Sequence, residues 1–172
     1  MVYDIVSFDL DGTLVDTAAE ISEAVNLALG AHGVARRPTA EITHLIGDGS
    51  RQLMLKLLAR LYRERPALAE TVGVEAVLER FERDLNATIG TMCAPYAGAH
   101  EALTRLREAG VRLACVTNKE LRLASRVLQA TRLDSLFELV VGGDSLPHKK
   151  PHGSVLRHVV ETLDRTLGIA ET

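Results

Sequence analysis

The sequence predicts an α/β protein with a doubly wound parallel sheet and an inserted all-helical domain. Two observations predict this fold class. Short apolar runs rich in β-branched residues alternate with helical periodicity at the N-terminus and again after about residue 92. The stretch between them shows helical periodicity alone. We therefore expect an α/β core built from residues 1–15 and 92–172, and a helical cap formed by residues 16–91.

The core is expected to follow the order strand, helix, strand, helix, strand, helix. This order gives right-handed parallel crossovers, and ligands of such sheets bind beyond the carboxyl ends of the strands. The expected strands cover residues 2–7, 111–117 and 137–141, and the expected helices cover residues 99–110, a stretch through 124–128, and 154–167.

The cap is expected to contain only helices. Apolar residues recur at helical spacing in four stretches, namely residues 18–31, 38–45, 51–64 and 74–90. Thr17 and Glu20 have the spacing of a capping box, so we expect Glu20, together with Asp16, to cap the first of these helices.

Composition excludes several classes of function. The 172 residues carry a net charge of -3 and only 3% aromatic side chains, which argues against nucleic-acid binding. No apolar run approaches the ~20 residues that cross a membrane, and no basic segment precedes the first strand. We therefore expect a cytoplasmic protein without a membrane partner. Cys93 and Cys115 have neither metal-ligand nor disulfide-framework spacing, so both are expected to be buried apolar residues.

Two carboxylates follow the first apolar strand directly. Asp9 and Asp11 lie two residues apart, ahead of Gly12 and Thr13, and alternation along a strand end directs both to the same side. Such close carboxylates repel each other unless a hard cation such as Mg²⁺ lies between them or one is protonated. An aspartate can serve as a nucleophile that accepts a phosphoryl group, while a second acts as general acid and base.

Polar residues after the later strands complete a pattern typical of phosphoryl transfer. Thr117 and Asn118 end the second strand, and Lys150 adds positive charge for a transferring phosphoryl group. Taken singly, Thr117–Asn118 would more often be a turn and Lys150 a surface lysine. Their order behind Asp9 favours a site.

These residues resemble the motifs of the haloacid dehalogenase superfamily. Asp9-Leu10-Asp11-Gly12-Thr13 resembles its first motif, Val116-Thr117-Asn118 its second, and Lys150-Pro151 its third. The segments 95–98, 116–119 and 142–151 resemble the phosphoglycolate phosphatases within that superfamily. The resemblance implies a Rossmann-like core with a small helical cap inserted after the first strand.

The resemblance also implies roles for individual residues. Asp9 would be the nucleophile and Asp11 the acid and base. Thr117 would bind the phosphoryl oxygens with help from the backbone of Asn118, and Lys150 would neutralise developing charge. Mg²⁺ would be held by the carboxylate of Asp9 and the backbone carbonyl of Asp11. The implied activity is hydrolysis of a small phosphorylated metabolite, with 2-phosphoglycolate as the best substrate prediction.

Other functions remain open from the sequence. Sugar phosphatases and phosphoglucomutases of the same family share every motif quoted, and a non-catalytic, self-associating protein is a third possibility. Arg51, after the Gly47-Asp48-Gly49 turn, is a candidate for binding a second anionic group of the substrate. An exposed arginine at a helix start is an equally good interpretation.

One family motif has no counterpart. The fourth motif is an acidic turn after a fourth strand, but the sequence ends at Thr172 in or near the helix that follows Lys150, so the core is expected to be truncated. We expect weaker Mg²⁺ binding as a result. We also expect the strand that contains Ile5–Phe8 to be an exposed sheet edge, through which a homodimer could form. Pro151-His152-Gly153 also departs from the family pattern, which usually has a second proline.

Overall fold

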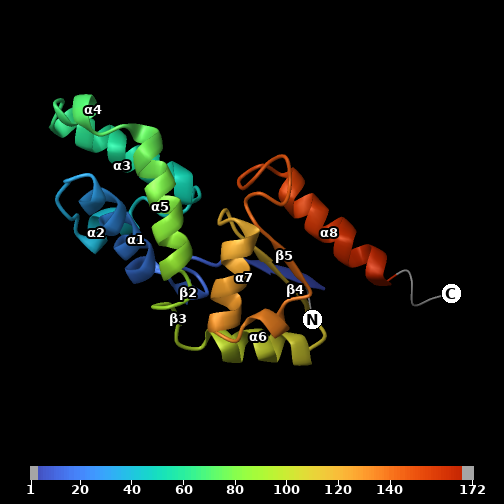
Figure 1. Cartoon of the computed structure of the whole chain (residues 1–172). Helices are drawn as coiled ribbons and strands as arrows, with labels where there is room; N and C mark the ends of the chain where they lie inside the picture. Colours follow the sequence, from blue (N-terminus) through green and yellow to red (C-terminus); the bar gives the residue numbers. More distant parts are fainter. Residues whose placement is uncertain (1–3, 168–172) are drawn as a thin grey trace. The chain divides into compact units, whose positions relative to one another are not determined.

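The computed structural model describes residues 4–167 (Figure 1). The described chain divides into two compact units, one of residues up to Asp16 together with residues from Ala94 onward, the other Thr17–Cys93. The sequence-predicted boundaries, at residues 15/16 and 91/92, lie one or two positions from these. The assignment of the two units as catalytic core and cap stays a prediction. The first two residues of the predicted opening strand lie outside the described residues.

The first unit contains a parallel sheet, which confirms the predicted α/β class. Its strands are β1 (Ile5–Phe8), β4 (Arg112–Val116) and β5 (Leu139–Val141), in the order β1-β4-β5 with both pairs parallel. β1 is therefore an edge strand among the described residues. The predicted strand at 137–141 is shorter in the structure, because residues Asp134–Leu136 form a 3-10 turn, η1, just before it.

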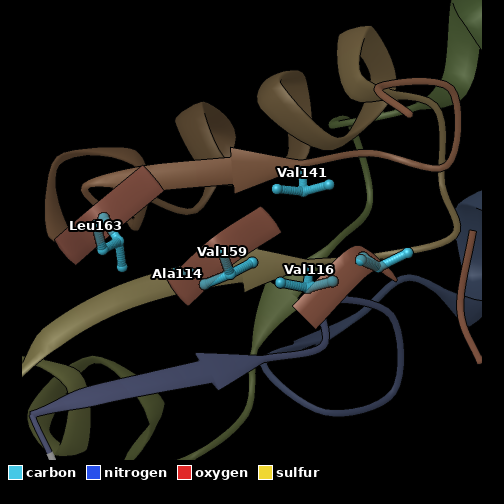
Figure 2. Packing of buried hydrophobic residues seen from close by; sticks show 6 residues of the cluster. Ala114, Val116, Val141, Val159 and Leu163 are labelled. Atoms are coloured by element: carbon cyan, nitrogen blue, oxygen red, sulfur yellow. The ribbon is translucent and has the colours of Figure 1, made fainter. Parts of the chain in front are cut away.

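Helices cover both faces of this sheet. They are α6 (Ala99–Glu108), α7 (Leu121–Ala130) and α8 (Ser154–Leu167). Figure 2 shows Val159 and Leu163 of α8 facing the apolar residues of β4 and β5, with which they form one buried cluster. α6 and α7 lie on the other side of the sheet (Figure 1). The spacing of Val155, Val159 and Leu163 places one stripe of α8 on the sheet, as apolar helical periodicity predicts.

A second, two-stranded sheet was not expected from the sequence. β2 (Val15–Asp16) pairs antiparallel with β3 (Ala94–Pro95), and the N–H of Tyr96 donates to the carbonyl of Leu14 at 2.9 Å. From the sequence we expect strands only at residues 2–7, 111–117 and 137–141. Two-residue strands have no periodicity to detect, and their pairing joins segments almost eighty positions apart, so only the folded chain reveals it.

The second unit is helical, as predicted. Its helices are α1 (Ala18–Ala31), α2 (Thr39–Thr43), α3 (Ser50–Glu64), α4 (Leu68–Thr71) and α5 (Val74–Thr88). α1 packs mainly on α5, and α3 also contacts α5. The buried side chains of these helices, including Ala24, Leu57 and Phe81, form the core of the unit. None of the described helices is long and apolar enough to cross a membrane.

The expected capping box at the start of α1 is wrong. Thr17 occupies the N-cap position without a side-chain hydrogen bond to the helix. Glu20 is fully buried, and its Oε2 accepts hydrogen bonds from the backbone N–H groups of Gly90 at 2.8 Å and Met92 at 3.3 Å. The carboxylate therefore fixes the segment that leaves α5, a use that local spacing cannot predict because the donors lie seventy residues away.

Candidate active site

The ends of β1 and β4 bring the first two motifs together. The two strands pair in parallel, with Phe8 opposite Cys115, so Asp9 and Thr117 follow neighbouring strand ends at the same edge of the sheet. Residue Thr117 continues the ladder, since its N–H donates to the carbonyl of Val141 at 2.9 Å. The sheet topology thus produces the arrangement that parallel α/β folds use for ligand sites.

Asp9 lies against the predicted third-motif lysine. The Nζ of Lys150 is 2.8 Å from Oδ1 of Asp9, and the N–H of Leu10 donates to the same oxygen at 2.8 Å. The Asp9 side chain is 40% exposed and that of Lys150 is 27% exposed, so solvent and a small ligand can reach both. A carboxylate held on one oxygen by two donors presents its other oxygen in a fixed direction, which suits a nucleophile.

Asp11 lies against a second lysine, for which the sequence analysis assigned no role. The Nζ of Lys119 is 2.9 Å from Oδ1 of Asp11. This pair is much less accessible, with 12% of the Asp11 side chain and 5% of the Lys119 side chain exposed. The available signal was the position of Lys119, a cation two residues after Thr117 at the end of an apolar strand. The resemblance to the family implies a role for Lys150 but none for Lys119.

Thr117 and Asn118 organise the loop after β4. Thr117 is buried, and its Oγ1 accepts a hydrogen bond from the N–H of Lys119 at 3.1 Å. The side chain of Asn118 donates from Nδ2 to the backbone carbonyl of Lys150 at 3.2 Å. Asn118 was expected to act through its backbone. In the structure its side chain also ties the segment that carries Lys150 to the end of β4.

Two glycines after β5 allow close approach to that loop. A Cβ on Gly143 would lie under 3.0 Å from the backbone of Asn118, and one on Gly142 would meet the backbone of Leu121. The N–H of Gly143 donates to the carbonyl of Lys119 at 2.8 Å. Oδ1 of Asp144 accepts from the N–H of Leu121 at 2.7 Å, at the start of α7. Asp144 thus has a structural contact at the start of α7.

The segment around Lys150 has contacts of its own. The rings of His148 and His152 stack with centroids 4.2 Å apart, one on each side of Lys150 in the sequence. Nδ1 of His152 is 2.7 Å from Oγ of Ser154, the first residue of α8. These contacts define the path of the loop despite the missing second proline.

Arg51 belongs to the other compact unit, at the start of α3. It forms an exposed ion pair with Glu75, at 3.2 Å between Nη2 and Oε1. The structure therefore gives Arg51 a local partner, and its predicted contact with substrate stays a prediction.

The strand-end aspartates also act on a neighbouring thiol. Cys115 lies in β4, and burial, followed by the negative charges of Asp9 and Asp11, raises its pKa to about 12, although Lys150 opposes the shift. Burial of this cysteine agrees with the sequence-based expectation. Cys93 is only partly buried.

The donor set fits a magnesium ion that retains water and substrate ligands. Asp9 and Asp11 offer oxygen ligands for a cation, and Lys119 and Lys150 offer positive charge for a phosphate, so the site can accommodate Mg²⁺ and a phosphate together. Both contacts described above for the carboxylate of Asp9 involve Oδ1. Among the described residues no group of three or more His, Cys, Asp or Glu side chains could hold a metal. Mg²⁺ commonly binds through one or two carboxylates plus water and phosphate oxygens, which this pair can supply.

Comparison with known proteins identifies the family. Residues 3–169 match the model of the haloacid dehalogenase-like hydrolases, and this is nearly the whole chain. The chain belongs to that family. The parallel sheet described above is thus the fold of that family, which is a family of hydrolases.

Curated relatives and solved structures agree with this family assignment. The chain is 36% identical over 159 residues to a phosphoglycolate phosphatase of Nitrosospira multiformis. The aligned region covers 92% of this chain and 69% of the relative. It is 38% identical to the plasmid-encoded phosphoglycolate phosphatase of Cupriavidus necator, over 92% and 67% of the two chains. A crystal structure of a predicted phosphoglycolate phosphatase from Haemophilus somnus 129PT matches with a TM-score of 0.84 at 27% identity, over 94% of this chain and 72% of that one.

Proposed function

We propose that the protein is a Mg²⁺-dependent phosphomonoester hydrolase that acts through a phosphorylated Asp9. The observation that carries the proposal is the pair of aspartates after β1, each paired with its own lysine, from different segments of the same unit. Nucleophile, acid and base, and balancing cations are the parts that phosphoryl transfer requires. Mg²⁺, when bound by Asp9 and Asp11, would supply further charge neutralisation on the phosphate oxygens.

In the first step a carboxylate oxygen of Asp9 attacks phosphorus. The P–O bond to the leaving group breaks, and Asp11, in its protonated form, donates its proton to the departing oxygen. The products are an alcohol and an aspartyl-phosphate on Asp9. Lys150, which contacts the attacking carboxylate of Asp9, offsets the negative charge that spreads over the phosphoryl oxygens.

In the second step water hydrolyses that phosphoenzyme. Asp11, now a carboxylate, accepts a proton from the water as its oxygen attacks phosphorus, and the P–O bond to Asp9 breaks. Inorganic phosphate leaves and both aspartates return to their starting protonation states. Thr117 and the backbone of the loop after β4 lie at the same strand edge, where they can hold the phosphoryl oxygens during both steps.

The proposed substrate is 2-phosphoglycolate, cleaved to glycolate and phosphate. The support comes from the several relatives at 34–38% identity that bear the name phosphoglycolate phosphatase. We further propose that Arg51 binds the carboxylate of this substrate through its fork of donors. The discriminating variant is Arg51→Ala, with Arg63→Ala on the same helix as the control. Loss of preference for 2-phosphoglycolate over sugar phosphates in Arg51→Ala alone supports the role, and an unchanged substrate profile contradicts it.

The activity itself is tested by phosphate release from 2-phosphoglycolate with and without Mg²⁺. We expect Mg²⁺-stimulated turnover in the wild type and none above background in Asp9→Asn. Asp164→Asn, the same change at an exposed position of α8, serves as the control and should retain activity. Equal rates in wild type and Asp9→Asn would contradict the nucleophile assignment. Absence of hydrolysis of any small phosphate ester would favour a non-catalytic protein, and transfer of phosphate back to a sugar substrate would favour a mutase.

A further inference from the structure

We propose that Lys119 is a positioning residue of the active site, whose ammonium group fixes the carboxylate of Asp11 for proton transfer. The inference rests on the proposed function, because it assigns a part in that reaction. It starts from the 2.9 Å contact between Nζ of Lys119 and Oδ1 of Asp11. Lys119 comes from the loop after β4 and Asp11 from the turn after β1, so the contact joins two segments that follow neighbouring strands.

Burial distinguishes this pair from an ordinary surface salt bridge. Only 5% of the Lys119 side chain and 12% of the Asp11 side chain are exposed. An ammonium group removed from water is costly unless a counter-charge compensates it, so each member of a buried pair restricts where the other can lie. The exposed pairs of the second unit, such as Arg51 with Glu75, carry no such restriction.

Lysine is rare in this chain, and both aspartates of the site contact one. Lysine occupies four positions among the 20 Lys and Arg residues, and two of those four contact the two aspartates of the site. A lysine ammonium is a compact charge with rotatable donors, whereas arginine is a broad planar fork. The buried position next to Asp11 therefore holds the side chain type that can direct a single strong hydrogen bond at one carboxylate oxygen.

Both backbone groups of Lys119, its N–H and its carbonyl, form hydrogen bonds. Its N–H donates to Oγ1 of Thr117 at 3.1 Å, and its carbonyl accepts from the N–H of Gly143 at 2.8 Å. The lysine stem thus begins at a fixed point, clamped between the loops that follow β4 and β5. An ammonium group on a fixed stem can hold Asp11 in one orientation.

That orientation matters for the proposed reaction. A general acid or base must lie within hydrogen-bond reach of the oxygen with which it exchanges a proton. A misplacement of about 1 Å can cost on the order of 10²-fold in rate. Lys150 contacts the nucleophile, whereas Lys119 contacts the group that moves protons, so the two lysines have separate parts. In this proposal Lys119 acts through Asp11.

The kinetic test replaces the lysine with a side chain of similar length and no charge. We expect Lys119→Met to lower kcat by roughly 10- to 100-fold while KM changes less than about threefold, because proton transfer is impaired and substrate binding is not. The control is Lys149→Met, an exposed lysine of the same chain, which should match the wild type. An unchanged kcat, or a loss confined to KM, would overturn the proposal.

A second test reads the pair directly, without turnover. With four lysines in the chain, ¹⁵N-detected ammonium signals can be assigned one by one through single Lys→Met variants. We expect the Lys119 signal to be protected from fast exchange with water and to shift in Asp11→Asn but not in Asp9→Asn, which should shift Lys150 instead. A Lys119 ammonium signal with the same chemical shift in wild type and Asp11→Asn would overturn the proposal.

The two tests separate failure of this inference from failure of the proposed function. A wild type without phosphatase activity would contradict the proposed function, and the ammonium spectra would still decide whether Lys119 fixes Asp11. An active wild type whose Lys119→Met variant is equally active would overturn the role of Lys119 alone. If Lys119→Met does not fold, the Asp11→Asn spectrum decides.

Discussion

The two lysine–aspartate pairs differ in how much water reaches them. Lys150 and Asp9 are partly exposed, which an incoming phosphate would require of the residues it contacts. Lys119 and Asp11 are nearly enclosed. Because water screens the exposed ion pair, Lys150 can leave Asp9 at little cost and contact a phosphate. Separating the buried pair of Lys119 and Asp11 is costly, so this pair keeps one arrangement. The same charges also reach Cys115 behind the strand end.

We expect the thiol of Cys115 to be unreactive at neutral pH. Its pKa is raised from 9.0 to about 12, so the thiolate that attacks alkylating reagents is scarce. Iodoacetamide at pH 8 should therefore label Cys93 in the native protein and label Cys115 only after denaturation, as mass mapping would reveal. Because the pKa is raised in the fold, the stability contributed by the neutral thiol is fully present below about pH 9 and is lost as the pH rises toward 12. Equal native labelling of both cysteines would contradict this prediction.

Glu20 should be a strong determinant of stability in the second unit. Replacement by Ala removes the acceptor for the N–H groups of Gly90 and Met92, and we expect a loss of roughly 2–4 kcal/mol in the free energy of unfolding. Denaturant unfolding measures this loss. Glu79→Ala, at an exposed position of α5, should change stability by less than about 0.5 kcal/mol. Similar effects of the two substitutions would contradict the proposed importance of the buried carboxylate.

Among the elements of the first unit, the loops that follow β4 and β5 are packed closely against each other. The Gly142–Gly143 segment touches the backbone of the loop after β4 on one side, and Asp144 accepts a hydrogen bond from the first N–H of α7. Asn118 binds the segment before α8. The loop between β4 and α7 and the loop between β5 and α8 are thereby joined, and they carry Thr117, Lys119 and Lys150 of the candidate site.

We expect Gly143→Ala to disturb this junction. An added Cβ would meet the carbonyl of Asn118, a backbone group that cannot turn away, so the loop after β4 must shift. The expected cost is about 1–3 kcal/mol of stability together with a loss of phosphatase activity. Gly153→Ala is the matched control, since nothing lies within 4 Å of a Cβ at that position. Thermal unfolding and turnover of both variants provide the measurement, and tolerance of Gly143→Ala would show that the contact can relax.

At the scale of the whole molecule, β1 is both the strand that carries the site and the edge of the described sheet. The N–H of Arg112 donates to the carbonyl of Asp4, and because such bonds alternate along a parallel pair, the backbone groups of Ile5 and Ser7 point away from β4. Unpaired edge groups on an apolar strand favour pairing with another chain. We therefore propose that the protein forms a homodimer through β1.

Ser7→Pro tests this dimer without breaking the sheet. Proline at position 7 removes an N–H that faces away from β4, which edge strands tolerate, but it blocks hydrogen bonding to a second chain. We expect sedimentation analysis to find dimers of the wild type at high concentration and monomers of Ser7→Pro. Retention of the same dimer by the variant would place the interface elsewhere, and a monomeric wild type would remove the proposal.

Much of the fold was predictable because it follows from local patterns. Apolar periodicity located the long helices to within a few residues, and runs of β-branched residues located the three parallel strands. The short elements escaped prediction. α4, η1 and the β2–β3 pair contain two to four residues each, too few for any period to be visible. The predicted capping box at Glu20 was wrong, because its carboxylate binds the distant N–H groups of Gly90 and Met92.

From the sequence alone we could predict the family, the positions of the three parallel strands along the chain, and Asp9, Asp11, Thr117 and Lys150 as site candidates. These depend on residue type and short spacing, which a linear chain displays. The tertiary structure alone decided which lysine meets which aspartate, and it added Lys119 to the site. Asp11 and Lys119 are 108 positions apart in the chain, and only the parallel pairing of β1 with β4 makes them neighbours. Contacts between strand ends are set by sheet topology, which no local pattern encodes.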